Sequence, residues 1–387
     1  MADRSLIFPA QEFRDRIARL QHQMGQDGID ALLLTSAADI FYVSGFLTRF
    51  WESPARPWYV IIPAGGDPVA VIPSIGQALM SRTWMPQIRT WDAPTPEDDG
   101  VSLLSQTLCD ILPETARIGV PKGLETQLRA PLGDFERVAS AITPRQFVDG
   151  TNAIQRVREI KSEAEVNKIK NACAIADRAF DRVPEFAQSG TSLADVFRAF
   201  QMTLLEEGAD WVSYVAGAAS ANGYEDVISP ADTRPMAAGD VLMLDTGAVH
   251  DGYFCDFDRN YSIGPASAAV RKTQDAVWLA TEHVLSNLRP GMLASDVHRM
   301  LVSEIANHGC TAGGGRLGHG LGVTLTEWPS FTPLDHTVLR AGMVLTIEPG
   351  AIVEGDKILV HEENIVLRDT GPELLSRRAP QAMPELS

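Results

Sequence analysis

Three aspartates lie close together in a strand-like stretch: Asp245 in VLMLDTG, then Asp256 and Asp258 in CDFDRNY. Between them, Asp251-Gly252 is a strong signal for a tight β-hairpin turn. If these two residues form the turn, Asp245 lies opposite Asp258, and the alternation of strand side chains directs all three carboxylates to one face. Because like charges opposite each other are destabilising, we expect a positive species between them.

A divalent metal ion fits this arrangement better than the simpler alternative, a solvated acidic face with Arg259 as its partner. Three later motifs offer further ligands: His319 in GRLGHGLG, Glu348 in TIEPG, and Glu362 or Glu363 in VHEEN. An oxygen-rich set with one imidazole favours Mn²⁺, Fe²⁺, Co²⁺ or Zn²⁺ over a thiolate-type structural zinc. Several carboxylates can also bridge two ions.

Alternating helix-like and strand-like segments position these motifs. Residues 11–27 have helical spacing, and strands are expected at 31–35, 58–63, 68–73 and 118–122. These segments predict a small α/β domain that ends near residue 150. A charged segment, 155–180, predicts an exposed helix that opens a second domain, in which helices at 267–288 and 295–308 alternate with strands.

Composition narrows the class of protein. The 387 residues predict about two domains, and the net charge of −17 argues against nucleic acid or an anionic membrane as a partner. The four scattered cysteines are typical of reduced thiols, so we expect a cytoplasmic protein. The first residues do not have the pattern of a signal peptide, and no apolar run is long enough to span a membrane.

The order of motifs DTG, DFDR, GHGLG, TIEPG and HEEN resembles the pita-bread metallopeptidase family, which includes aminopeptidase P, prolidase, methionine aminopeptidase and creatinase. The resemblance covers nearly the whole chain. It implies an α/β (α+β) fold, with a creatinase-type N-terminal domain over residues 1–152 and a pita-bread catalytic domain over residues 153–387. The segment VREIKSEAEVNKIKNA resembles the helix that opens the catalytic domain.

The same resemblance implies a site with two divalent metal ions (Mn, Fe, Co or Zn). Its five ligands fall on Asp245, Asp256, His319, Glu348 and Glu362. The implied activity is that of a hydrolase similar to Xaa-Pro aminopeptidase or prolidase, in which a hydroxide that bridges the metals attacks an amide carbonyl. Glu348 and His319 are the expected catalytic residues, with Glu348 shuttling the proton.

Three positions depart from the family's peptidase pattern. Thr326 replaces a second histidine, the stretch around Ile228 lacks another, and Asp258 replaces a threonine and could be an additional ligand. These departures keep open a relative that acts on a small zwitterion: a creatinase-like or ectoine-hydrolase-like C–N hydrolase, or a dimethylsulfoniopropionate lyase. An inactive binding module is a third interpretation.

Substrate-binding roles are expected for Arg56, Arg259 and Tyr253. In creatinase an arginine placed like Arg56 binds the substrate carboxylate from the neighbouring subunit, so the resemblance also implies a homodimer. The aromatic residues near it, Trp51 and Trp58 among them, could wall a pocket, although a core or a dimer interface is their commoner use.

Overall fold

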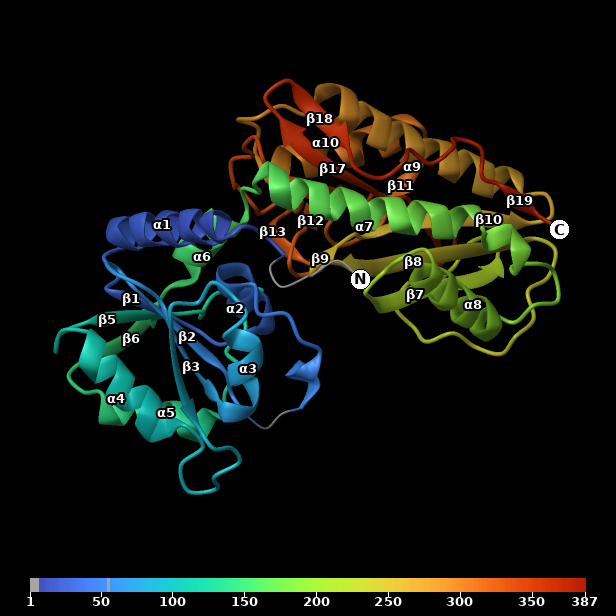
Figure 1. Ribbon diagram of the computed structural model, residues 1–387. Coiled ribbons are helices and arrows are strands. Elements are labelled where there is room, and N and C mark those ends of the chain that lie inside the picture. Colours follow the sequence, from blue (N-terminus) through green and yellow to red (C-terminus); the bar gives the residue numbers. More distant parts are fainter. Residues whose placement is uncertain (1–6, 54–55) are drawn as a thin grey trace. The chain divides into compact units, whose positions relative to one another are not determined.

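The structure is a computed structural model that describes residues 7–53 and 56–387. The chain forms two compact units, one up to Arg158 and one from Glu159 onward, and each is described by itself (Figure 1). The division falls at the end of helix α6 (Thr151–Arg158), whereas the sequence places it between residues 152 and 153. Helix α6 packs against helix α1 (Ala10–Asp27), which makes it part of the first unit.

The first unit is a six-stranded mixed sheet with helices, as the sequence predicts. Its sheet order is β4-β3-β2-β1-β5-β6. The strands are β1 (Ala31–Leu34), β2 (Tyr59–Pro63), β3 (Val69–Pro73), β4 (Gln87–Trp91), β5 (Arg117–Val120) and β6 (Gln146–Asp149). The remaining helices are α2 (Ala37–Ser44), α3 (Gln77–Met80), α4 (Val101–Ile111) and α5 (Leu132–Ala141), with 3₁₀ turns η1 (Phe50–Glu52) and η2 (Ser74–Gly76). Helix α1 buries Phe13, Ile17, Leu20 and Met24, the face that its spacing predicts.

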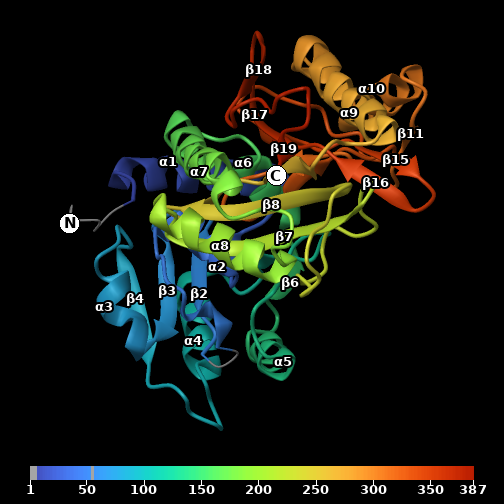
Figure 2. The same ribbon diagram turned by 90° about the vertical axis from the view of Figure 1, so that its right-hand side faces the viewer.

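The second unit combines helices with several separate β-sheets. Its helices are α7 (Glu163–Asp181), η3 (Val183–Glu185), α8 (Leu193–Glu206), α9 (Ala268–Asn287) and α10 (Ala294–Asn307). One sheet has the order β19-β10-β8-β7, and β9 (Tyr253–Phe254) pairs with β8 beside it. The bounds of these strands are β7 (Trp211–Ala221), β8 (Asp240–His250), β10 (Phe257–Ile263) and β19 (Glu385–Leu386). The views in Figures 1 and 2 both place α9 beside α10 and β7 beside β8.

Two further sheets carry the C-terminal motifs. The order β13-β12-β14-β17-β18 joins β13 (Glu327–Ser330), β12 (His319–Gly320), β14 (Val344–Ile347), β17 (Glu363–Arg368) and β18 (Gly371–Leu374). The order β11-β15-β16 joins β11 (Thr311–Ala312), β15 (Gly350–Glu354) and β16 (Lys357–Val360). No helix in the described residues is long and apolar enough to cross a membrane.

The expectation of one exposed helix over residues 155–180 is wrong in two respects. The segment is two helices, α6 and α7, because Ser162 caps α7 with a capping box that involves Glu165. Several of its charged side chains are also buried, since Lys161 forms an ion pair with Glu327 and Glu165 accepts a hydrogen bond from Tyr253.

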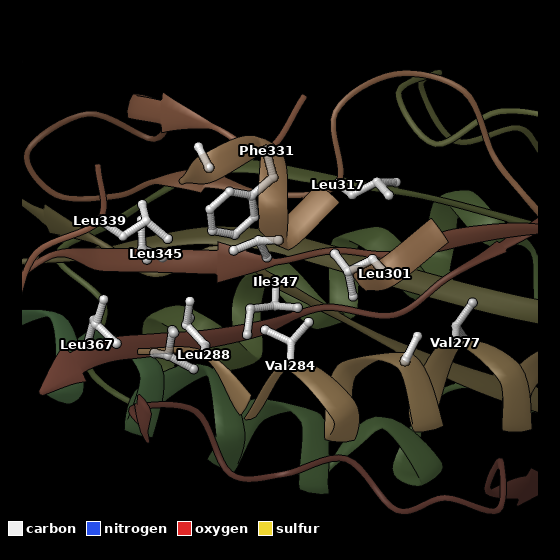
Figure 3. Close-up of a cluster of buried hydrophobic side chains, with 14 of the residues drawn as sticks. Val277, Val284, Leu288, Leu301, Leu317, Phe331, Leu339, Leu345, Ile347 and Leu367 are labelled. Carbon is white, nitrogen blue, oxygen red and sulfur yellow. The ribbon is translucent and has the colours of Figure 1, made fainter. Parts of the chain in front are cut away.

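The main core of the second unit lies between helices α9 and α10 and strands β14 and β17. Figure 3 shows Val284 of α9, and Leu288 directly after that helix, near Ile347 of β14 and Leu367 of β17. Because side chains alternate along a strand, the residues next to these apolar positions point to the opposite face. Glu348, which follows Ile347 directly, is thereby directed away from the core.

The β8–β10 hairpin has the register that the sequence predicts. Asp245 lies opposite Asp258, and His250 lies opposite Tyr253 across the turn. Asp251 and Gly252 both have positive φ angles, of 51° and 81°, as a tight hairpin turn requires.

Candidate metal centre

Side chains from three separate motifs converge on one buried point of the second unit. Asp256 precedes β10, His319 begins β12, and Glu362 precedes β17. One ligand atom of each of these three residues lies within 4.8 Å of the others, and all three side chains are buried. The spacing suits the coordination of a cation by two carboxylates and one imidazole.

The other two expected ligands border this group. Glu348 Oε2 lies 3.7 Å from His319 Nε2, and Asp256 Oδ2 lies 3.2 Å from the same nitrogen. Asp245 is linked to Asp256 through Tyr214, whose hydroxyl contacts Oδ1 of both aspartates, at 3.0 Å from Asp245. The structure therefore brings together all five residues that the sequence names as candidate ligands.

The imidazole of His319 is oriented for coordination. Its Nδ1 lies 2.7 Å from the carbonyl oxygen of Gly320, so Nδ1 is the protonated nitrogen that donates to this carbonyl. In the neutral ring, Nε2 then carries the lone pair, and it faces the carboxylates. The backbone N–H of His319 donates to Thr346 Oγ1 at 3.0 Å, which fixes the start of β12 beside β14.

The electrostatics of this cluster call for added positive charge. Burial, followed by repulsion from Asp256 and other carboxylates, raises the pKa of Asp245 and of Glu362 well above the usual range. Burial alone would lower the pKa of His319, but Glu348 and Asp256 outweigh it and raise that pKa. Among the described residues, the buried Glu362 Oε1 has no hydrogen-bond partner. A buried oxygen of this kind is costly unless a cation binds it, so the donor set fits divalent metal ions.

Tyr214 is a site residue that sequence reasoning missed. It lies on β7, and its ring passes over Gly247, where an added Cβ would come within 2.4 Å of a ring carbon. The contact depends on an irregularity in the β7–β8 pairing between Val212 and Val215, which no local pattern predicts. The glycine two residues after Asp245, on the same face, is the only sequence signal that a neighbour needs this space.

Asp258 and Asn364 form hydrogen bonds with the backbone of two of the expected ligand residues. Asp258 Oδ1 accepts a hydrogen bond of 2.7 Å from the backbone N–H of Glu362, and Asn260 Nδ2 lies 3.3 Å from the other oxygen. Asn364 accepts from the backbone N–H of Asp256 at 3.0 Å and donates to its carbonyl oxygen. Both oxygens of Asp258 thus meet protein donors, which is the arrangement of a positioning group.

A buried ion pair anchors the loop that follows His319. Lys161 Nζ lies 2.8 Å from Glu327 Oε2, and the two side chains are 2% and 1% exposed. The other oxygen of Glu327 accepts from the backbone N–H groups of Val323 and Thr324 at 2.9 and 3.2 Å. The carboxylate therefore fixes the backbone between His319 and β13.

Known proteins match nearly the whole chain. A family model described as "Metallopeptidase family M24" matches residues 167–369, and one described as "Creatinase/Prolidase N-terminal domain" matches residues 16–160. The chain belongs to the M24 metallopeptidase family. A "Probable dipeptidase PepE" from Mycobacterium tuberculosis is 28% identical, and the match covers 95% of this chain and 97% of the relative. An Xaa-Pro dipeptidase from Pyrococcus horikoshii is 25% identical over 94% and 97% of the two chains.

The fold of this M24 family member also has solved counterparts. The crystal structure of a prolidase from Thermococcus sibiricus superposes with a TM-score of 0.85 at 25% identity, over 97% of this chain and 99% of the other. The predicted combination of a creatinase-type N-terminal domain and a C-terminal pita-bread domain is confirmed.

Two residues expected to bind substrate have structural contacts in this M24 protein instead. Tyr253 is fully buried, and its hydroxyl donates to Glu165 Oε1 of α7 at 3.0 Å. Arg259 donates to the carbonyl oxygen of Glu362 at 3.0 Å and to Glu363 Oε2 at 3.1 Å, and it packs over the Phe257 ring. Strand alternation directs both side chains into the packed layer under α7, where Arg259 supports the backbone of Glu362.

The remaining candidates lie outside the cluster. Arg56 belongs to the first unit, where it has a left-handed φ of 65° and packs over the ring of Phe50. Ile228, at the stretch without the expected histidine, is 85% exposed on a loop. Thr326 is the last residue of the loop that Glu327 anchors, and its hydroxyl accepts from Arg316 Nη2 at 3.1 Å.

Proposed function

We propose that this M24 family member is a dinuclear-metal hydrolase that cleaves an amide bond in a small peptide. The observation that carries the proposal is the convergence of the five expected ligand side chains on one buried cluster, in which one oxygen of Glu362 has no hydrogen-bond partner among the described residues. A group of buried carboxylates without enough donors destabilises the fold and is kept where it binds a cation.

The five side chains divide by position. Asp256 and Glu362, at the centre of the cluster, would hold the ions together with Asp245, His319 and Glu348. When bound, the two ions would activate water and polarise the amide carbonyl. Glu348, whose side chain is 18% exposed, lies at the solvent edge and would carry the proton from water to the leaving amine. His319 presents Nε2 because Gly320 holds its other nitrogen.

The substrate class follows the named relatives, a dipeptidase and an Xaa-Pro dipeptidase, so Xaa-Pro dipeptides are the first compounds to assay. Manganese, iron, cobalt and zinc remain candidate metals, because availability often decides among them. A homodimer, with Arg56 as a carboxylate-binding residue for the partner's site, and a cytoplasmic location also belong to this proposal.

A second candidate is a hydrolase or lyase of small zwitterions. It is favoured by Thr326, which contacts Arg316 where peptidases of the family carry a histidine, and by the exposed, histidine-free stretch around Ile228. Substrate panels should therefore place betaines and N-acyl amino acids beside the dipeptides.

The first experiment measures metal per chain by elemental mass spectrometry on gently purified protein, with Asp245→Ala as the control. About two ions per chain, reduced in the control, together with cleavage of Ala-Pro, are the expected result. Metal-free protein that takes up none of the four metals on reconstitution would refute the proposal, and an inactive binding module would then be the better interpretation.

A further inference from the structure

The second unit contains a cavity of about 440 Å³, and none of the five expected metal ligands is among the residues that line it. Its walls come from the end of α7, from β10 and α9, and from the C-terminal segment 377–384. Two of its residues connect this wall to the backbone of the cluster, since Arg259 donates to the carbonyl oxygen of Glu362 and His361 directly precedes that residue. The volume lies within the roughly 300–1,000 Å³ of small-molecule sites.

A buried amide in the wall of this cavity lacks a protein partner. Gln274, on α9, is 4% exposed, and among the residues that the structure describes its Oε1 has no hydrogen-bond partner. Leaving such a group unpaired costs free energy that an apolar side chain at the same place would not cost. His361 adds a donor to the same wall, because its Nε2 accepts from Arg378 Nη1 and the neutral ring then carries its proton on Nδ1. These buried polar groups suit a polar ligand.

The charges that line the cavity are of both signs. The guanidinium groups of Arg259 and Arg378, 10% and 17% exposed, both pair with the fully buried carboxylate of Glu363. Two cations that share one buried carboxylate leave this side of the cavity positive. Asp177 Oδ1 lies 4.0 Å from Arg259 Nη2, and burial raises the pKa of Asp177 to about 6, so this carboxylate lacks a full complement of positive charge. The wall therefore offers a site for an anion next to a site for a cation.

We propose that this cavity binds a free α-amino acid outside the metal centre, with its carboxylate at Arg259 and Gln274 and its ammonium group at Asp177. A guanidinium and an N–H donor match a carboxylate in charge and geometry. The two charged groups of an α-amino acid are joined through one carbon, so they fit opposite charges that lie as close together as Arg259 and Asp177. The apolar walls, which include Phe180 and several prolines, suit an aliphatic side chain. The inference does not depend on the proposed amide hydrolysis, although an amino acid would be a product of that reaction.

The test is calorimetric titration of the purified protein with L-leucine. Wild type and Asp245→Ala should both bind it, because Asp245 belongs to the metal cluster and does not line the cavity. Gln274→Leu should weaken binding at least about tenfold, since it removes a hydrogen bond to a charged group. Gln201→Leu is the matched control: Gln201 lies exposed on α8, outside the cavity, and its replacement should leave binding unchanged.

A second comparison tests the ammonium end of the site. N-acetyl-L-leucine lacks the positive charge, so wild type should prefer L-leucine to it, and Asp177→Asn should lose most of that preference. This comparison also decides the matter if Gln274→Leu does not fold. A wild-type protein that does not bind L-leucine would overturn the inference, as would unchanged affinity in Gln274→Leu. Loss of binding in Asp245→Ala would overturn it too, because the amino acid would then occupy the metal centre.

Discussion

The ion pair between Lys161 and Glu327 gives the sharpest stability prediction. Replacing Lys161 with Met leaves Glu327 buried, 1% exposed, and still held by the backbone N–H groups of Val323 and Thr324. Breaking one side of a buried pair costs about 3–5 kcal/mol. The carboxylate can escape by taking up a proton, and protonating a glutamate of ordinary pKa costs about 3.7 kcal/mol at pH 7. We therefore expect Lys161→Met to lower the free energy of unfolding by about 3–4 kcal/mol at pH 7.

The sign of the pH dependence separates this explanation from a simple packing defect. A buried glutamate that has lost its lysine binds a proton that the unfolded chain has already released, so the loss of unfolding free energy grows with pH above about 4.3, by up to about 1.4 kcal/mol per pH unit. Urea denaturation of metal-free protein at pH 5, 6 and 7 measures it. The double variant Lys161→Met/Glu327→Gln removes the charge and should lose most of this pH dependence. A deficit of Lys161→Met that is constant from pH 5 to 7 would refute the reasoning.

Three other predictions concern the site, the pH response and the assembly. Tyr214→Phe removes the hydroxyl contacts to Asp245 and Asp256 and should weaken metal binding about tenfold, as measured by competition with a chelator; unchanged affinity would exclude a positioning role. Burial raises the pKa of Asp177 to about 6, so this group lowers stability as pH rises from about 4 to 6. Asp177→Asn should therefore gain about 2 kcal/mol relative to wild type at pH 7 compared with pH 4, measured by denaturant titration. If Arg56 serves the partner's site, mixing the inactive Arg56→Ala and Asp256→Ala proteins should restore some activity. Activity that stays lost in the mixture would contradict the cross-subunit proposal.

Sequence patterns were sufficient where local rules determine geometry. Asp251-Gly252 fixed the hairpin turn, and the period of two then placed Asp245 opposite Asp258, as the structure confirms. The spacing of apolar residues located α1, α9 and α10 to within a few residues. The convergence of His319, Glu348 and the aspartates could be expected only through the order of the motifs, because nothing local states that separate sheets meet.

Contacts between distant elements explain what sequence reasoning missed. The mixed charges of residues 155–180 indicated a solvated helix, yet Lys161 and Glu165 are buried because Glu327 and Tyr253 lie opposite them. A local window contains no information about those partners. Tyr214 was missed for the same reason, since its approach to Asp245 requires the irregular pairing of β7 with β8.

The two adjacent glutamates of the HEEN motif show how the fold assigns different roles to identical side chains. Glu363 accepts hydrogen bonds from Arg259, Arg378, Ser376 and the backbone of Ala379, and although burial alone would raise its pKa, Arg259 and the other donors lower it. Glu362, one residue earlier and on the opposite face, has a raised pKa and one oxygen without a partner among the described residues. The difference lies in the supply of donors, which strand alternation assigns. A fold selected for stability alone would satisfy both carboxylates or bury neither. We therefore expect Glu362, and not Glu363, to bind the cation.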